Sequence, residues 1–327
     1  MSAILILIFF SFCSEKENRT FSKRKLSEVS SFTFPGKIHR YFVDDSITHI
    51  FGSPYERILS YTDDGILVKE VGKPGPADWE ITSLWWYDEN DTSYTMYDYG
   101  KNLINRFQSK SDSLVTSYKY VSRSNIIKHG QFHYLTTSLT PKGDFEFSLL
   151  DIRDNNTVKK FAVNDLLIEI GVKEFKDIDF LLYGDFTKSN TNSNIFIFYC
   201  LNAPVFFKID LGKNEIQAFK DFRYEYMPEI YRTGKRVVLS PNQNWFVSGS
   251  VIDDEIYFLT TDNKESYIKQ SSQWFLDIYH LKDGTYKESI PMNFSSDERF
   301  PFEIRNRADN LIIGFDYEKL KLYEVKK

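Results

Sequence analysis

The sequence predicts an all-β fold and, within that class, a six-bladed β-propeller. Two observations about composition support the class. Phe and Tyr number 29 and 21 among 327 residues, and aromatic residues make up 17% of the chain. Aromatic and β-branched side chains suit the half-buried surface of a pleated sheet. Long apolar heptads are absent from the sequence, which argues against a helical bundle.

A third observation, a repeated strand–turn–strand unit, predicts the architecture. Each unit has a tight polar turn between two aromatic or β-branched runs. Gly, Asn and Asp tolerate the positive φ angles that tight hairpins require. Six such turns lie at residues 62–65, 98–101, 151–155, 210–214, 281–284 and 316–319. The last turn is the weakest of the six, because Asp316 is its one residue of this kind.

The spacing of the turns predicts the number of blades. The mean gap is about 51 residues, close to the 40–50 residues of a four-stranded blade. The individual gaps are 35, 55, 57, 72 and 34 residues, so the repeat is degenerate and a count of seven blades stays open. An N-terminal strand, Phe32–Phe34 or Ile38–Val43, could pair with the last hairpin and close the ring.

The N-terminus carries an export signal. Residues 3–12 are apolar except for Ser11. Ten residues rise only about 15 Å as a helix, half of a bilayer core, which is too short to span but typical of a signal peptide. Residues 14–30 are polar, so we expect a flexible tether there. We expect a single propeller domain over residues 31–327.

Cys13 directly follows the apolar run, and the chain then turns polar at Ser14 and Glu15. This arrangement resembles a bacterial lipoprotein signal, in which residues 1–13 are the signal peptide and the acylated cysteine. The resemblance implies a lipid on Cys13 and a place in the cell envelope as an outer-membrane lipoprotein, facing the periplasm or the cell surface. A secreted protein that is cleaved elsewhere is the alternative.

A turn near the second unit carries a family resemblance. Gly75, Pro76, Asp78 and Trp79 are similar to the Gly-Pro-Gly turn, followed by an acidic and an aromatic residue, of Bacteroidetes six-bladed TolB-like propeller lipoproteins. Ala77 stands where the second glycine is common. The resemblance implies six blades, and many such families have no assigned activity.

Charge and motifs exclude several functions. The net charge is −5, with no basic field for a phosphate backbone, so we expect no nucleic-acid partner. The sequence lacks a Gly-x-Ser-x-Gly elbow. His129 and His133 flank Gly130 in a strand-like run, and Asp88–Asp91 lacks the calcium-loop pattern. We therefore assign no catalytic residue, no cofactor and no metal.

Two segments suggest binding. The longest gap contains Phe222–Arg236, which combines aromatic residues with arginines, a composition found at binding hot spots. We predict partner contacts from Arg223, Tyr224, Tyr226, Tyr231 and Arg232. A connection pinned over a blade edge is the alternative. Trp85 and Trp86 lie in a predicted strand, which would point one indole each way and could leave one as a platform for a sugar ring.

These observations favour a binding or scaffold lipoprotein whose propeller engages a protein or glycan. The alternative is a cell-envelope hydrolase or lyase acting on glycans, with carboxylates gathered in the central channel from distant strands. Several carboxylates, histidines or arginines converging in a deep axial pocket would favour the enzyme. A plugged channel would count against it.

Overall fold

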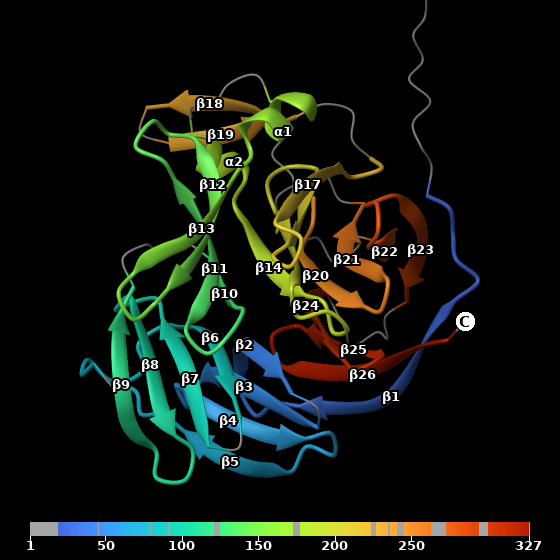
Figure 1. Cartoon of the computed structure of the whole chain (residues 1–327). Helices are drawn as coiled ribbons and strands as arrows, with labels where there is room; N and C mark the ends of the chain where they lie inside the picture. Colours follow the sequence, from blue (N-terminus) through green and yellow to red (C-terminus); the bar gives the residue numbers. More distant parts are fainter. Residues whose placement is uncertain are drawn as a thin grey trace, which may run out of the picture.

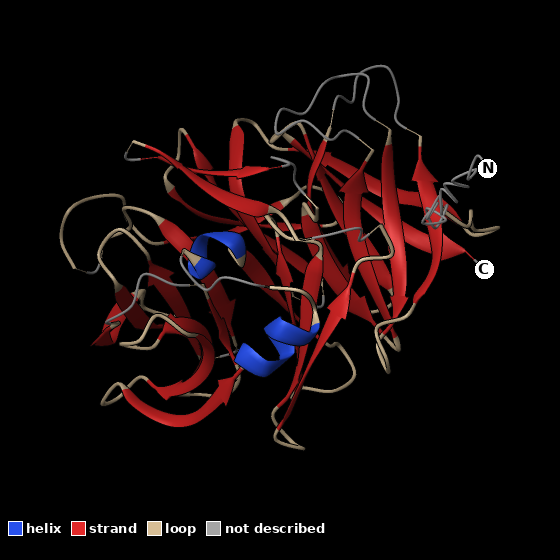
Figure 2. Cartoon of the chain, turned by 90° about the horizontal axis from the view of Figure 1, so that it is seen from above, coloured by secondary structure: helices blue, strands red, loops and turns tan. Residues whose placement is uncertain are grey.

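The computed structural model describes residues 19–326 except 45, 79, 91, 121–124, 173–176, 224–226, 235, 241–244, 263–272 and 294–299. The protein is 61% strand and 4% helix, which confirms the predicted all-β class. Strands make up nearly all of the regular structure drawn in Figure 2, with short helical segments at one place. No helix in the described part of the chain is long and apolar enough to cross a membrane.

Six four-stranded antiparallel sheets form a ring, so the protein is a six-bladed β-propeller (Figure 1). Blades 1 and 2 are β2 (Lys37–Val43), β3 (Ile47–Ser53), β4 (Arg57–Thr62) and β5 (Leu67–Val71), then β6 (Leu84–Glu89), β7 (Ser93–Asp98), β8 (Leu103–Gln108) and β9 (Ser113–Lys119). Blades 3 and 4 are β10 (Ile126–Lys128), β11 (His133–Leu139), β12 (Phe145–Asp151) and β13 (Asn156–Ala162), then β14 (Gly184–Lys188), β15 (Ile195–Cys200), β16 (Val205–Asp210) and β17 (Glu215–Lys220). Blade 5 is β20 (Ser248–Ile252), β21 (Glu255–Thr261), β22 (Trp274–His280) and β23 (Tyr286–Met292).

Blade 6 combines the two ends of the chain. Its strands are β24 (Pro301–Arg307), β25 (Asn310–Phe315), β26 (Lys319–Lys326) and β1 (Lys25–Thr33). β1 runs antiparallel to β26, with Leu26 opposite Val325 and Phe32 opposite Leu320. An N-terminal strand therefore closes the ring, as expected. The candidate Ile38–Val43 belongs to β2 instead.

The propeller begins earlier than the sequence predicts. Residues 25–30, which we assigned to the tether, form the first part of β1. They are polar because β1 is the outermost strand of its blade and leaves many of its side chains exposed. Leu26 and Phe32 supply its apolar contacts. An edge strand needs few apolar side chains, so its amino-acid composition resembles that of a polar linker.

The six predicted turns lie in six different blades, but at two different places within the blade. The turns at 62–65, 151–155, 210–214 and 281–284 join the third strand to the fourth. The turns at 98–101 and 316–319 join the second strand to the third. Each of the two short gaps, of 35 and 34 residues, runs from a turn between the third and fourth strands of one blade to a turn between the second and third strands of the next. Such a gap contains one hairpin fewer than a full blade repeat, which explains its length.

The longest gap contains an extra hairpin between blades 4 and 5, in which β18 (Glu229–Thr233) pairs with β19 (Arg236–Ser240). Two short helices, α1 (Asn164–Glu169) and α2 (Ile178–Leu181), connect blades 3 and 4. The hairpin and the helices gather at one edge of the ring, at the top of Figure 1. Arg232 of β18 pairs with Asp177, which precedes α2.

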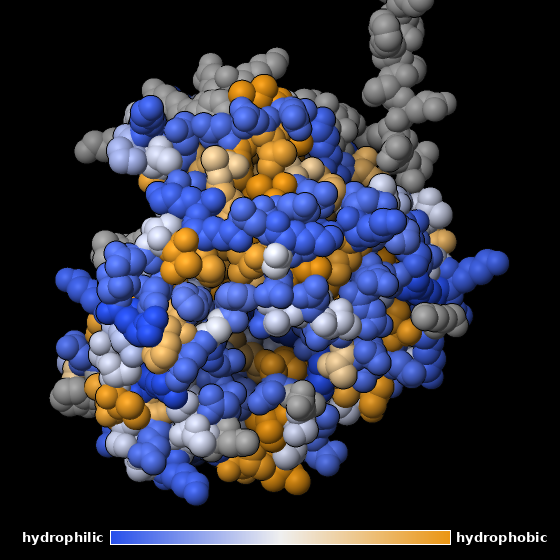
Figure 3. Space-filling view, in the orientation of Figure 1, coloured by the Kyte–Doolittle hydropathy of each residue, from blue (hydrophilic) through white to orange (hydrophobic). Residues whose placement is uncertain are grey.

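Apolar side chains fill the spaces between neighbouring blades. The middle strands are buried on both faces because each blade is covered by a neighbour on either side, and every residue of β7 is buried. The ring of Phe147 in blade 3 lies 5.1 Å from that of Phe198 and 5.4 Å from that of Phe207, both in blade 4. Burying one such side chain contributes about 1.5–3 kcal/mol. Hydrophilic residues cover much of the face drawn in Figure 3, with apolar patches between them.

A short segment ahead of β1, residues 19–24, packs against blade 5. We call it the N-terminal strap. The backbone N–H groups of Ser22 and Ser289 donate to the carbonyls of Ser289 and Thr20, each at 2.9 Å. Arg24 donates to both carboxylate oxygens of Glu255, at 2.6 and 2.8 Å. The strap therefore links blade 5 to β1, the outer strand of blade 6.

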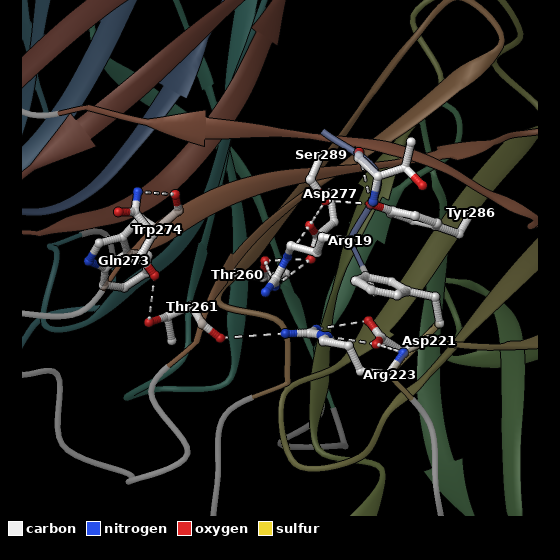
Figure 4. Close-up of polar contacts among 12 residues, drawn as sticks. Arg19, Asp221, Arg223, Thr260, Thr261, Gln273, Trp274, Asp277, Tyr286 and Ser289 are labelled. Atoms are coloured by element: carbon white, nitrogen blue, oxygen red, sulfur yellow. Dashed lines mark hydrogen bonds and ion pairs between the residues drawn. The ribbon is translucent and has the colours of Figure 1, made fainter. Parts of the chain in front are cut away.

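Arg19 of the strap reaches a carboxylate that is fully buried in blade 5 (Figure 4). Asp277 of β22 is 0% exposed. It accepts two hydrogen bonds from Arg19, at 3.1 and 3.2 Å, and one from Thr260 at 2.6 Å. Burial opposes ionisation of Asp277, but the positive charges of Arg223 and Arg19 outweigh that effect and lower its pKa.

Glu255→Gln is expected to destabilise the protein at pH 7 and to flatten its response to acid. Burial alone would raise the pKa of Glu255, but hydrogen bonds from Arg24, Lys287 and Tyr257 lower it from 4.5 to about 2. A carboxylate with a depressed pKa stabilises the fold above about pH 4.5 and loses that contribution as pH falls toward 2. The shift corresponds to roughly 3 kcal/mol. Urea unfolding at pH 7 and pH 3 measures it, and an unchanged pH dependence in the variant would contradict the assignment.

Candidate functional site

The innermost strand of each blade faces the axis of the ring, and these six strands are β2, β6, β10, β14, β20 and β24. Two cavities lie along this axis. The larger cavity has a volume of about 400 Å³ and is lined by residues of β2, β6, β10, β14 and β24. The smaller has a volume of about 240 Å³ and also touches Ser248 of β20. Arg40, Trp85 and Asp185 border both cavities, so the two meet at that level.

Trp85 and Trp86 both border the larger cavity, contrary to the expectation that they point opposite ways. Leu84 pairs with Asp98 and Trp86 with Tyr97, so Trp85 is an extra residue in the strand. Such a β-bulge interrupts the alternation of side chains. The bulge has no signature in the sequence.

Three cations of the larger cavity lie over aromatic rings. The Arg40 guanidinium is 4.0 Å from the centre of the Trp85 ring. The Lys128 ammonium is 5.7 Å from the centre of the Trp86 ring. In the same way, the ammonium of Lys188 is 5.9 Å from the ring of Phe196. Each contact adds about 0.5–1 kcal/mol or more and restrains the position of the charge.

Three carboxylates converge on the axis, and each has a cation as a neighbour. Arg40 lies 3.6 Å from Asp185 and 3.9 Å from Glu303. Glu303 also pairs with Arg305 of its own strand. Asp88 of β6 pairs with Lys128 of β10. These pairs join blade 1 to blades 4 and 6, and blade 2 to blade 3.

Burial changes the protonation of two further groups beside the larger cavity. Burial lowers the pKa of Lys188, an effect that Asp88 opposes and Lys128 reinforces. Burial also lowers the pKa of His129, and a hydrogen bond to the backbone of Ser193 offsets part of that shift. His129 is therefore neutral at pH 7. In the described part of the chain, no group of His, Cys, Asp and Glu side chains could hold a metal ion.

The structure describes three of the five residues predicted to contact a partner, and these three differ in exposure. Arg223 is largely buried: it pairs with Asp221 at 2.7 Å and donates to the carbonyl of Trp245 at 2.9 Å. Tyr231 and Arg232 are exposed on the β18–β19 hairpin. Tyr224 and Tyr226 lie outside the described residues, as does Cys13. Partner contact through this segment stays a prediction.

The sequence did not point to the charged residues of the axis. Arg40, Asp185, Lys188, Glu303 and Arg305 lie in the first strands of three different blades. A usable signal is a charged residue in the first strand of a blade, where the side chain faces the channel instead of a neighbouring blade. That signal requires the blade boundaries to be known first.

No family model matches the sequence, and no curated protein matches it. Two solved structures are similar over nearly the whole chain. One is a Bacteroides fragilis protein described as a "putative exported protein", with 10% identity and a TM-score of 0.59, covering 95% of this chain and 98% of that one. The other, a DUF4221 family member from Bacteroides vulgatus, has 9% identity and a TM-score of 0.53, covering 93% and 98%. The likeness is one of fold.

Proposed function

We propose that this protein is an exported envelope lipoprotein whose propeller binds a ligand in the larger axial cavity. The observation that carries the proposal is the cavity itself: about 400 Å³, lined from five blades, with charged groups restrained by aromatic rings. Small-molecule sites are concave, have volumes of about 300–1,000 Å³ and carry a few fixed polar groups. This arrangement supports binding by a preformed site.

The proposed cellular location of the protein rests on its N-terminal sequence. The apolar run and Cys13 support export and acylation. Two likenesses agree with that location: the structural similarity to a Bacteroides protein described as exported, and the resemblance to propeller lipoproteins. The lipid would attach the propeller to the outer membrane.

Cys13→Ser is expected to move the protein from the membrane fraction to the soluble fraction of the envelope. Two signals are needed for stable anchoring, and the acyl chains on one lipoprotein cysteine provide them. Fractionation of intact cells and labelling with a radioactive fatty acid measure the change. Cys200→Ser is the matched control, because that thiol is buried in blade 4. Fatty-acid label retained in Cys13→Ser would refute the anchor.

Binding is favoured over catalysis by the state of the carboxylates. Asp88, Asp185 and Glu303 do converge on the axis, as the enzyme hypothesis requires. Each, however, is engaged in an ion pair with a neighbouring Arg or Lys, whereas a general acid must hydrogen-bond the group that it protonates. Release of products from envelope glycans by the purified protein would reverse this choice.

A ligand screen tests the proposal. The full-length protein, purified in detergent, is heated in the presence of neutral sugars, acidic sugars and short peptides. A ligand at 100 times its Kd adds about 2.7 kcal/mol of stability and raises the melting temperature. Arg40→Met should weaken binding, whereas Arg57→Met is the control, since Arg57 pairs with Glu70 away from the axis. Ligands that bind equally to both variants would place the site elsewhere.

A further inference from the structure

We propose that the larger cavity selects a small organic anion, and that Lys188 makes the principal contact with its carboxylate or phosphate group. This inference rests on the proposed function, because it names the ligand class of the same site. Three features of the cavity support it: its charge balance, the unpaired state of Lys188 and the occupied faces of the tryptophans.

The larger cavity has an excess of positive charge. Its lining includes four cations, Arg40, Lys128, Lys188 and Arg305. The carboxylates that neighbour them are Asp88, Asp185 and Glu303. One positive charge is left over, in a chain whose net charge is −5. A cavity opposite in sign to the whole protein is a feature of binding and not of general surface composition.

Among the four cations of the larger cavity, Lys188 is the one to which the described residues supply no ion-pair partner. Within the part of the chain that the structure describes, no carboxylate lies within ion-pair distance of its ammonium group. The nearby Asp88 is engaged by Lys128. A half-buried ammonium that lacks a partner loses hydration without compensation, which costs stability. A bound anion would supply the missing partner.

The tryptophans are not free to stack against a neutral sugar. The ring of Trp85 is contacted by the guanidinium of Arg40, at 4.0 Å, and by the ring of Tyr99, at 5.7 Å. Trp86 carries Lys128 over its ring and meets Tyr134 edge-on. Both indoles therefore serve to place cations. This arrangement fits recognition of a ligand by its charge better than the stacking of a sugar ring on an exposed indole, which the sequence suggested.

The volume limits the size of the anion. A cavity of about 400 Å³ is at the low end for ligand sites, which suits one or two sugar-sized units. The carboxylates on the axis would repel a polyanion. A molecule with a single acidic group, such as a sugar acid or a sugar phosphate, meets both conditions.

The probes are glucuronate, glucose 6-phosphate and glucose, titrated calorimetrically into the full-length protein in detergent at low salt. We expect at least one of the two acids to bind and glucose to bind at least tenfold more weakly. The difference in affinity between glucuronate and glucose 6-phosphate distinguishes a carboxylate site from a phosphate site. Glucose binding as tightly as both acids would overturn the inference.

Lys188→Met keeps the alkyl chain and removes the charge. We expect it to weaken binding of the acid at least tenfold, which is the typical loss for a charged hydrogen bond of about 1.5 kcal/mol. Lys208→Met is the matched control: Lys208 is also half-buried in blade 4 but donates to the carbonyl of Lys282, away from the cavity. Equal affinity in the wild type and Lys188→Met would overturn the inference.

A measurement without ligand keeps the test independent of the probes. Lys188→Met should raise the melting temperature because it removes an unpaired, half-buried charge, whereas Lys208→Met should lower it. A lower melting temperature in Lys188→Met would show that the ammonium is already satisfied, and the inference would fail. If a neutral ligand from the screen binds and neither acid does, the inference fails while the proposed function stands; if nothing binds, both fail.

Discussion

A chain that begins at Phe34 is expected to lose cooperative folding. It lacks β1 and therefore exposes the full edge of β26, which normally pairs with eight residues of β1. The apolar contacts of Leu26 and Phe32 disappear as well. Unpaired strand edges associate with other chains. We expect the loss of most of the roughly 5–15 kcal/mol that stabilises a typical domain, seen as a broad thermal transition and as aggregates in size-exclusion chromatography.

Two longer chains are the controls for this truncation. A chain that begins at Arg19 keeps the strap and β1, and should unfold like the full-length protein. A chain that begins at Lys25 keeps β1 but lacks the strap, and should remain folded with a lower melting temperature. A sharp, wild-type transition in the chain that begins at Phe34 would contradict closure of the ring by β1.

Asp277→Asn is expected to cost about 3–5 kcal/mol, the usual penalty for removing one partner of a buried ion pair. The substitution preserves the shape of the side chain but removes the charge that balances Arg19 and the nearby Arg223. It also weakens acceptance of the Thr260 hydroxyl at 2.6 Å. Urea unfolding at pH 7 measures the change in the free energy of unfolding.

Asp309→Asn is the matched control for Asp277→Asn, because Asp309 is exposed in the turn between β24 and β25. Its effect should stay within about 0.5 kcal/mol. The same Asp277 substitution in the chain that begins at Lys25 should cost less, because Arg19 is then absent. Equal costs in the two chains would show that Arg19 and Asp277 are not energetically coupled.

The ring of blades could be predicted because hairpin chemistry is local. A tight turn with a positive φ restricts the residues that can occupy it, and Asn155, Asn214 and Asp316 do adopt positive φ. These turns identified one hairpin in every blade. They could not identify which hairpin, since the turns after the second and the third strand have the same chemistry. The irregular spacing of the turns follows from that ambiguity and from the inserted β18–β19 hairpin.

The axial site could not be predicted for two physical reasons. Its charged residues come from single positions in strands that are far apart in the sequence, so no local pattern marks them. The bulge at Trp85 then changes which way the following residues point. Arg223 shows that a local pattern can also mislead. The segment around it has the composition of a binding hot spot, but its guanidinium lies largely buried and contacts Asp221 and the carbonyl of Trp245.

The pairing of β1 with β26 also determines when the protein can finish folding. Glu28 and Lys321 form an ion pair at 2.7 Å although 293 residues separate them. A chain synthesised from its N-terminus presents β1 first, and β26, the partner strand of β1, comes last. Until β26 is available, β1 has no strand to pair with. Any pause in synthesis thus prolongs a state in which an unpaired strand can associate with other chains.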